Sequence, residues 1–197
     1  MMDNKRISLL VSRTKEGDQE AFTELVNFFS ERVYNLALRI LKSPDDASDV
    51  LQETFLAVYE KIGTFDGRSN FYTWVYRIAT NFALMKLRKD KRTILTDEDM
   101  EAKFDSPDKM QISEWRDLPL HDMLSKEFRK HLDEAVDELP EIYRSVFILR
   151  DIENMSIKET SAILGITESN VKIRLKRARL FLREKLAKYM DEYLKEA

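Results

Sequence analysis

The 197-residue sequence contains no cysteine, only two histidines, four glycines and four prolines. The absence of cysteine excludes disulfides, iron–sulfur clusters, cysteine-ligated zinc and thiol catalysis, and two histidines cannot by themselves build a histidine-rich metal site. The scarcity of glycine and proline excludes a collagen-like chain and an all-β barrel. The sequence therefore predicts neither a metal ion nor any other cofactor.

Long hydrophobic runs are also missing. No apolar run approaches the ~20 residues that a membrane helix needs, and the N-terminus leads into no apolar signal-peptide segment. We expect a soluble, cytoplasmic protein without membrane insertion.

Charged residues are abundant, making up 35% of the chain against ~25% in typical globular domains. The net charge of −3 is unevenly distributed, because residues 68–92 hold seven basic side chains and one acidic one, and residues 171–188 hold eight and one. Between these blocks, residues 96–138 hold fourteen acidic and six basic side chains. The predicted fold is all-α, with two small helical domains joined by an acidic flexible linker. The expected parts are an N-terminal helical bundle (1–92), the linker (93–134) and a C-terminal helix-turn-helix domain (135–197).

Hydrophobic spacing and capping residues place the helices. Ser43 followed by Pro44 and two aspartates is a typical helix start, because the serine caps, proline fits the first position and carboxylates favour the positive end of the dipole. Ser156 and Glu159 have the spacing of a capping box, and either Thr167 or Ser169 can cap the last helix. The expected helices span residues 21–41, 44–62, 70–89, 140–150, 156–164 and 167–189.

The last two helices form a helix-turn-helix pattern with its turn at Gly165. In that motif the second helix enters the major groove of DNA. Apolar residues of the second helix, such as Val171 and Leu175, fall on one inner face. Basic residues cover the rest of its surface, where they can reach phosphates and base edges. These are Lys172, Arg174, Lys176, Arg177 and Arg179.

The helix expected over 70–89 combines basic and aromatic residues. Its apolar positions Phe71, Val75, Ile78 and Phe82 predict one buried face. Three further aromatics, Tyr72, Trp74 and Tyr76, are then expected to be exposed. Exposed aromatics beside cations suit unpaired bases, and stacking contributes about 1–3 kcal/mol per base. Core packing remains the alternative for these rings.

Acidic side chains cluster on the helix expected over 44–62. Asp45, Asp49 and Gln52 share a face, with Asp46 and Glu53 beside them. Paired carboxylates can serve acid–base catalysis or bind a cation, but no histidine, glycine loop or nucleophile–base pair lies nearby. A docking surface for a basic protein partner is the favoured interpretation. The two histidines, His121 and His131, are interpreted as surface side chains.

Three motifs, 45–56, 65–81 and 139–179, resemble those of bacterial RNA polymerase sigma factors of the extracytoplasmic-function (ECF) group, and the resemblance covers nearly all of the chain outside the linker. It implies a transcription initiation factor that is not an enzyme. The implied partners are core RNA polymerase, through its β′ clamp helices and β subunit, promoter DNA and an anti-sigma factor. Ile173 and Met85 depart from residues common in the family, so the promoter sequence is not implied.

The resemblance also implies a role for particular residues. Those implied to dock on core polymerase are Asp45, Asp49, Gln52 and Glu53. Those implied to recognise and melt the minus-ten element are Phe65, Asp66, Gly67, Arg68, Ser69, Asn70, Tyr72, Trp74, Tyr76, Arg77 and Asn81, with Asn81 and the loop 66–70 forming a pocket for a flipped base. Those implied to read the minus-thirty-five element are Ser169, Asn170, Lys172, Ile173, Arg174, Lys176 and Arg177.

The linker has two expected properties. A flexible segment of about 40 residues can span the ~70 Å between two DNA elements two helical turns apart, but it cannot fix that distance. A rigid scaffold must do so, and core polymerase is the implied one. The acidic charge of the linker is further expected to suppress DNA binding by the free protein. Two alternatives remain open: a free-standing helix-turn-helix regulator, and a hydrolase that uses the 45–53 carboxylates.

Overall fold

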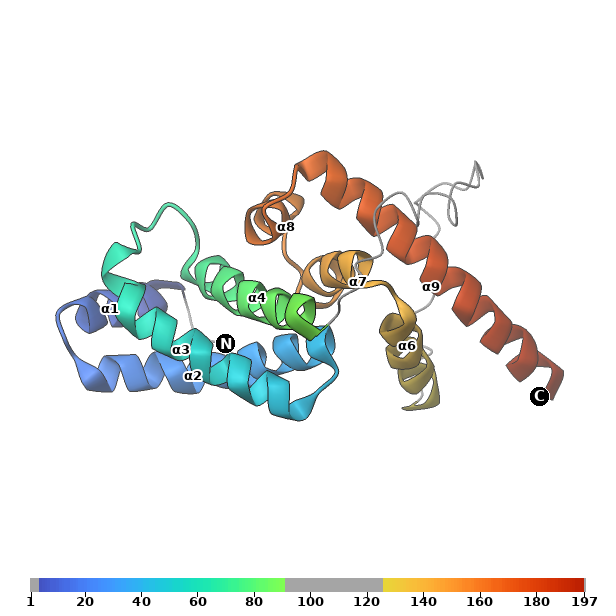
Figure 1. Ribbon diagram of the computed structural model, residues 1–197, viewed down its shortest axis with the longest axis horizontal. Helices are drawn as coiled ribbons and strands as arrows, with labels where there is room; N and C mark the ends of the chain where they lie inside the picture. The colour runs from blue at the N-terminus through green and yellow to red at the C-terminus, as the bar shows by residue number, and fades with distance from the viewer. Residues whose placement is uncertain (1–3, 91–125, 197) are drawn as a thin grey trace. The chain divides into compact units, whose positions relative to one another are not determined.

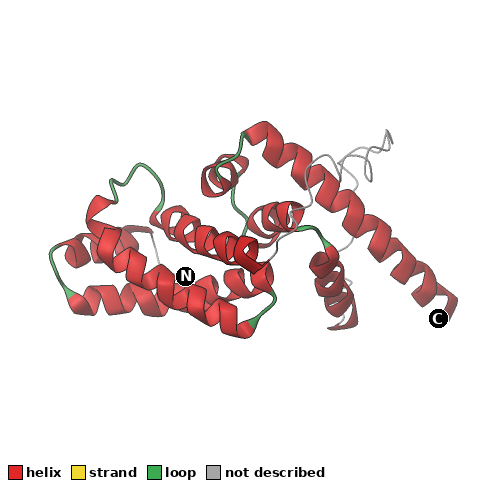
Figure 2. Ribbon diagram, viewed as in Figure 1, coloured by secondary structure: helices red, strands yellow, loops and turns green. Residues whose placement is uncertain are grey.

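A computed structural model describes residues 4–90 and 126–196, and every regular element in these ranges is helical (Figure 2). The all-α prediction is therefore confirmed. In chain order the elements are α1 (Asn4–Lys15), α2 (Gln19–Leu41), α3 (Pro44–Lys61), the short 3-10 helix η1 (Ile62–Thr64), α4 (Phe71–Asp90), α6 (Lys126–Glu138), α7 (Glu141–Phe147), the π-helical turn η3 (Ile148–Ile152), α8 (Ile157–Leu164) and α9 (Glu168–Glu196) (Figure 1).

The first of two units contains α1 to α4. Helix α2 packs against α1, α3 and α4, and α3 packs against α4 (Figure 1). Phe29 and Val33 of α2 and Val50 of α3 are fully buried, which places the core between these helices. The apolar stripe predicted for residues 21–41 therefore faces a bundle core.

Local capping explains where these helices begin. The Asp18 side chain accepts a hydrogen bond from the Ala21 N–H, 3.0 Å away, and caps α2. This bond, followed by the hydrogen bond from Arg13, lowers the pKa of the Asp18 carboxyl. Ser43 caps α3 by accepting from the Asp46 N–H, and Pro44 occupies the first helical position, as predicted. Helix α1 was not among the helices predicted from the sequence, because hydrophobic spacing did not single it out.

The second unit contains α6, α7, η3 and α9. Helix α9 packs against α6 and α7, and Tyr143, Val146 and Leu182 are buried in this unit. The helix expected over 140–150 is α-helical only over α7, and the chain then continues as the π-helical turn η3.

Helix α6 corrects the expected extent of the linker. Residues 126–134 were assigned to the flexible linker but belong to this helix. Their high charge obscured an amphipathic pattern, and Ala135 and Val136 at the end of the helix are buried. Residues 93–125, which include His121 and the acidic residues expected to suppress DNA binding, lie outside the described residues, so that hypothesis and the domain boundaries stay predictions.

Candidate nucleic-acid interface

The residues predicted to dock on a protein partner form one exposed face of α3. Asp45, Asp49, Gln52 and Glu53 are all exposed, and their spacing places them along one side of the helix. The large apolar side chains Leu56 and Tyr59, 64% and 55% exposed, continue the surface toward the end of α3. Acidic and apolar groups in one stripe can bind a basic partner and also bury apolar area against it.

One docking carboxylate already has an intramolecular partner. The Lys86 Nζ atom of α4 lies 2.6 Å from Oδ2 of Asp49 and 2.9 Å from Oδ1 of Asp46. The hydrogen bonds that Lys86 donates to Asp49 and Asp46 raise the pKa of the Lys86 ammonium, while Lys86 and then Ser43 lower the pKa of the Asp46 carboxyl. This bridge joins α3 to α4. Lys86 was not singled out from the sequence, where its only signal is its position in the basic block 68–92.

The loop between η1 and α4 is held by its own side chains. Asp66 accepts a hydrogen bond from the Arg68 N–H at 3.0 Å and forms an ion pair with the Arg68 Nε atom at 3.1 Å. Gly67 has φ +75°, a left-handed conformation that favours glycine. Asn70 accepts from the Tyr72 N–H at 3.1 Å and caps α4. The exposed residues 66–70, including Ser69, therefore form a defined turn.

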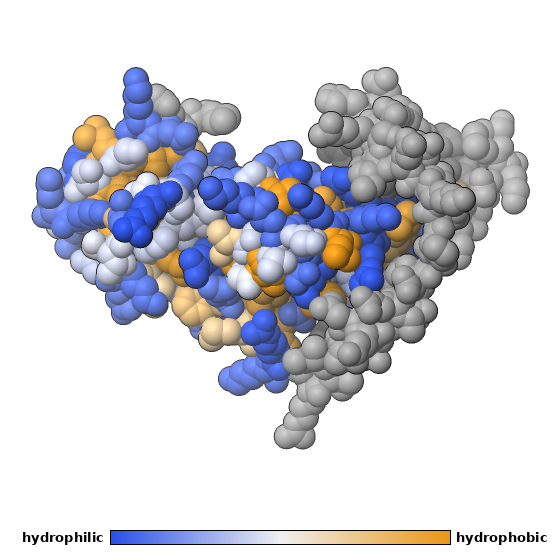
Figure 3. Space-filling model, turned by 90° about the horizontal axis from the view of Figure 1, so that it is seen from above, coloured by the Kyte–Doolittle hydropathy of each residue, from blue (hydrophilic) through white to orange (hydrophobic). Residues whose placement is uncertain are grey.

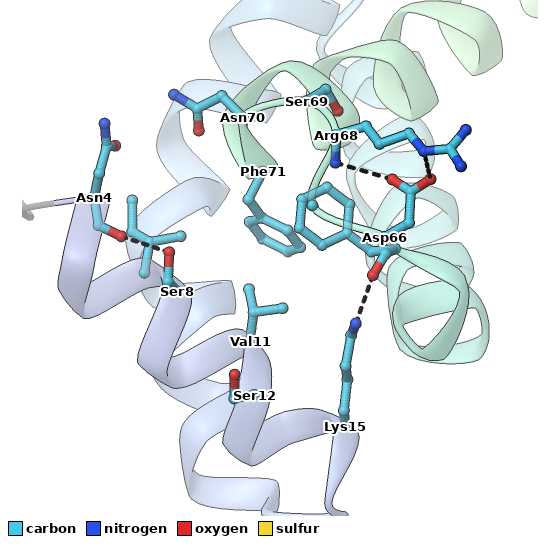
Figure 4. A pocket seen from close by; sticks show the side chains of 13 residues that line it. Asn4, Ser8, Val11, Ser12, Lys15, Asp66, Arg68, Ser69, Asn70 and Phe71 are labelled. Carbon is cyan, nitrogen blue, oxygen red and sulfur yellow. Dashed lines mark hydrogen bonds and ion pairs between the residues drawn. The ribbon is translucent and has the colours of Figure 1, made fainter.

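A cavity of about 530 Å³ lies between this loop and α1 (Figure 4). The Lys15 Nζ atom donates a hydrogen bond to the Phe65 carbonyl oxygen and lies 5.8 Å from the centroid of the Phe65 ring. The cavity is lined by Asn4, Ile7, Ser8, Val11, Ser12, Lys15 and residues 65–71. No residue of α1 was predicted from the sequence as a site residue. The signal that could have found them is the four-residue spacing of Asn4, Ser8 and Ser12, which places these polar side chains on one helix face.

The aromatic residues of α4 correct one prediction. Tyr76 was expected to be exposed for base stacking, but it is 0% exposed. Its ring stacks on Tyr72 with 4.3 Å between centroids, the two hydroxyls share a 2.6 Å hydrogen bond, and Tyr72 in turn contacts Phe29. The buried face of α4 runs through Val75, Tyr76, Ala79 and Ala83, whereas Ile78 and Phe82, expected to be buried, are partly exposed.

Trp74 is only half exposed. It contacts Phe65 and Phe71 with centroid distances of 5.4 and 5.5 Å, and Phe65 and Phe71 lie 5.3 Å apart. This aromatic cluster attaches the loop to the start of α4. Trp74 therefore supports the loop as well as presenting a partly accessible ring.

Arg77 and Asn81 lie four residues apart on the exposed face of α4. Asn81 does not line the cavity beside α1. It follows Asn70 by eleven residues, which corresponds to about 16 Å along a helix axis. The pocket of Asn81 with residues 66–70 therefore differs from the cavity beside α1, and it stays a prediction.

The turn of the helix-turn-helix is held by the predicted caps. The Ser156 N–H donates to Glu159 at 2.8 Å, and the Glu159 N–H donates to the Ser156 hydroxyl at 3.1 Å. This reciprocal pair confirms the capping box. Gly165 has φ +66°, and Thr167 accepts from the Asn170 N–H at 3.2 Å, so Thr167 rather than Ser169 caps α9.

Helix α9 presents a mixed polar and basic surface. Val171, Leu175 and Ala178 are buried, as predicted. Arg174 and Arg177 are half exposed, and the Arg177 guanidinium donates to the Tyr143 hydroxyl at 3.4 Å. The exposed candidates for promoter contacts are Ser169, Asn170, Lys172, Ile173 and Lys176.

Arg179 does not belong to that exposed surface. Its Nε and Nη2 atoms bond both carboxylate oxygens of Asp151 at 2.8 and 2.7 Å. The side chains are only 21% and 15% exposed. The expectation that Arg179 lies on the exposed basic surface of α9 was wrong, because this fork joins α9 to the π-helical turn.

Within residues 4–90 and 126–196, no three histidine, aspartate or glutamate side chains gather as metal ligands, and no helix is long and apolar enough to cross a membrane. His131 lies beside Glu134 on α6, with 3.2 Å between Nδ1 and Oε2. On the face drawn in Figure 3, hydrophilic residues dominate the coloured surface and apolar residues form small separate patches.

Comparisons with known proteins match two segments of the chain to one protein family. Residues 25–93 match the Sigma-70 region 2 family, and residues 129–182 match the Sigma-70 region 4 family. The ECF RNA polymerase sigma factor SigW of Bacillus subtilis is 34% identical over 94% of this chain and 97% of its own. The ECF RNA polymerase sigma-E factor of Escherichia coli is 37% identical over 87% of this chain and 89% of its own.

Solved structures give the same result at the level of fold. CnrH, solved in complex with the cytosolic domain of CnrY, superposes with a TM-score of 0.64 at 25% identity, covering 94% of this chain and 98% of its own. The sigma factor RpoE of Bartonella quintana, solved with the anti-sigma factor NepR, shares the fold with a TM-score of 0.60 at 23% identity, covering 84% of this chain and 96% of its own. The chain therefore belongs to the ECF family of RNA polymerase sigma factors.

Proposed function

We propose that this chain is an alternative sigma factor that binds core RNA polymerase, recognises the minus-thirty-five and minus-ten elements of a promoter and promotes DNA melting. The observation that carries the proposal is the presence of three different surfaces on one chain. These are the exposed acidic face of α3, the loop 65–70 with the exposed face of α4, and the exposed basic face of α9. A free-standing DNA-binding regulator has no need of the first two.

The acidic face of α3 is proposed to dock on the clamp helices of the β′ subunit. Asp49 and Glu53 supply negative charge, and Leu56 supplies apolar area beside them. Complementary charges steer association and fix the register of two docked surfaces. The Lys86 bridge holds Asp49 in place while leaving that residue's side chain 60% exposed to a partner.

The loop and α4 are proposed to hold the single strand of the minus-ten element. Asn81 and Arg77 offer an amide and a guanidinium on one exposed face. A melting step without ATP hydrolysis requires that unpaired bases gain contacts that paired bases lack, since extruding a base costs a few kcal/mol. A pocket at the loop and an amide further along α4 supply such contacts at two separate points of the strand.

Helix α9 is proposed to read the minus-thirty-five element as duplex DNA. Lys172 and Lys176 are exposed at four-residue spacing and suit phosphates, whereas Ser169 and Asn170 at the helix start suit base edges. Buried Val171 and Leu175 set the orientation of this exposed face.

Control by an anti-sigma factor is proposed from the relatives. CnrH was solved with the cytosolic domain of CnrY bound. A protein that covered the α3 docking face of this chain would prevent its association with polymerase.

Core binding by charge-neutralised variants tests the docking proposal. Asp49→Asn combined with Glu53→Gln should weaken binding to core polymerase by about tenfold or more, because two charges leave the contact surface. Glu20→Gln with Glu31→Gln is the matched control, since it removes two exposed carboxylates from α2 instead. Equal loss in both variants would show that total charge, rather than the α3 face, governs docking. Site-specific duplex binding by the free chain, with no polymerase association, would favour a free-standing regulator.

A further inference from the structure

The cavity beside the minus-ten loop has a second wall that the loop does not supply. Six of its thirteen lining residues come from α1. Helix α1 ends at Lys15, ahead of the Sigma-70 region 2 match, which begins at residue 25. Nearly half of the lining residues thus come from a helix outside the residues matched to the Sigma-70 region 2 family.

The α1 wall carries a row of polar groups. Asn4, Ser8 and Ser12 follow at intervals of four residues, so they lie along one side of the helix facing the cavity (Figure 4). The Ser8 hydroxyl donates to the Asn4 carbonyl oxygen at 3.0 Å, which leaves its own oxygen able to accept a hydrogen bond. Ile7 and Val11, each 5% exposed, form the apolar base of this wall.

Lys15 connects the two walls. Its ammonium donates to the Phe65 carbonyl oxygen and lies 5.8 Å from the Phe65 ring centroid. Phe65 is the first residue of the loop after η1, and its ring joins Phe71 in the aromatic cluster. Lys15 therefore fixes the point at which the loop leaves the bundle, and it places one positive charge at the cavity.

We infer that α1 forms the second wall of a pocket for one unpaired nucleotide of the melted promoter strand, with Ser8 and Ser12 contacting the base and Lys15 acting as a positioning residue for the loop. This inference rests on the proposed function. The volume of about 530 Å³ falls within the range of pockets that bind small organic ligands. Aromatic rings suit the face of a base, hydroxyl and amide groups suit its edge, and the guanidinium of Arg68 suits its phosphate.

The test uses holoenzyme and forked promoter DNA whose minus-ten non-template strand is unpaired. The promoter is selected by the holoenzyme from a randomised library, and each non-template base is replaced in turn by an abasic site. The parent should show one position where the abasic site weakens binding most. The quantity compared is the ratio of the affinity for intact DNA to the affinity for DNA with the abasic site. The Ser8→Ala/Ser12→Ala variant, and separately Lys15→Met, should lower this ratio about three- to tenfold at this position only, as expected when one or two hydrogen bonds are lost.

Two controls separate a positioning role from loss of folding. Lys5→Met removes the same charge from α1 at a residue that does not line the cavity and should keep the parent's ratio. Lys15→Arg keeps a charged donor and should restore it. An unchanged ratio in the Ser8/Ser12 and Lys15→Met variants would overturn the inference while leaving the proposed function standing. A parent that shows no base dependence at any position would overturn the melting function and this inference with it.

Discussion

Replacement of Arg179 by methionine separates a structural role from a DNA-contacting role in α9. Arg179 bonds both carboxylate oxygens of Asp151, and the two side chains are 21% and 15% exposed. Arg179→Met keeps a long apolar stem but removes the guanidinium, leaving the Asp151 carboxylate without that partner in a mostly buried position. We expect the C-terminal unit to lose stability and the DNA contact surface to stay intact.

The magnitude follows from the exposure of the pair. Exposed ion pairs contribute about 0–1 kcal/mol, whereas removing one partner of a fully buried pair costs about 3–5 kcal/mol. A bidentate pair of intermediate exposure should therefore cost about 1.5–3 kcal/mol. For a domain of 60–100 residues, each 1 kcal/mol lowers the melting temperature by about 4–8 °C.

Amide hydrogen exchange in α7 and α9 measures the effect in the C-terminal unit alone. The free energy of opening should fall by about 1.5–3 kcal/mol in Arg179→Met and by a similar amount in Asp151→Asn. The double variant should lose less than the sum of the two, since each change removes the same interaction. Promoter affinity at a temperature where both proteins are folded should match the parent's.

Lys176→Ala is the matched comparison. Lys176 is exposed on the same helix, so its removal should lower promoter affinity without changing the free energy of opening. The reasoning would be refuted if Arg179→Met left hydrogen exchange unchanged and weakened promoter binding as Lys176→Ala does. Arg179 would then contact DNA.

Four other substitutions give separate tests. Asn81→Ala should impair open-complex formation more than closed-complex binding, because its amide acts only once a base has left the stack; permanganate footprinting at saturating holoenzyme would show equal opening if this is wrong. Lys172→Ala should weaken binding to all promoter sequences about equally and reduce the salt dependence of binding by about one unit of slope, and a loss confined to one base position would assign it a base contact instead. Tyr76→Ala should destabilise the first unit by about 3–5 kcal/mol in denaturant titration because the ring is fully buried, and near-parent stability would contradict its core assignment. Lys86→Met should raise the pKa of the Asp46 carboxyl toward its ordinary value, since Lys86 is the main cause of its lowering; an unchanged carbon-13 carboxyl titration would exclude the bridge in solution.

Capping rules correctly predicted the helix starts that depend on residues close together in the sequence. Ser43 with Pro44, and Ser156 with Glu159, cap helices as their spacing indicates, because these bonds join residues three apart. Helix α1 was missed, since its polar row resembles a solvated face until the loop 65–70 is placed against it.

Errors arose where tertiary packing decides which helix face is buried. Tyr76 and Arg179 both have polar groups that favour exposure in a sequence. Packing of α4 against its neighbours nevertheless buries the Tyr76 ring, whose hydroxyl bonds Tyr72 one turn earlier in the same helix, and the Arg179 guanidinium bonds Asp151 of another element.

Run-off transcription with purified core RNA polymerase tests the central claim most directly. The template is a promoter selected by the reconstituted holoenzyme from a randomised library. Core polymerase with the parent chain should produce a transcript of defined start, neither component alone should do so, and Asp49→Asn with Glu53→Gln should lower its yield at limiting concentration. Site-specific duplex binding by the chain without polymerase, together with no transcript from the combined components, would contradict the account.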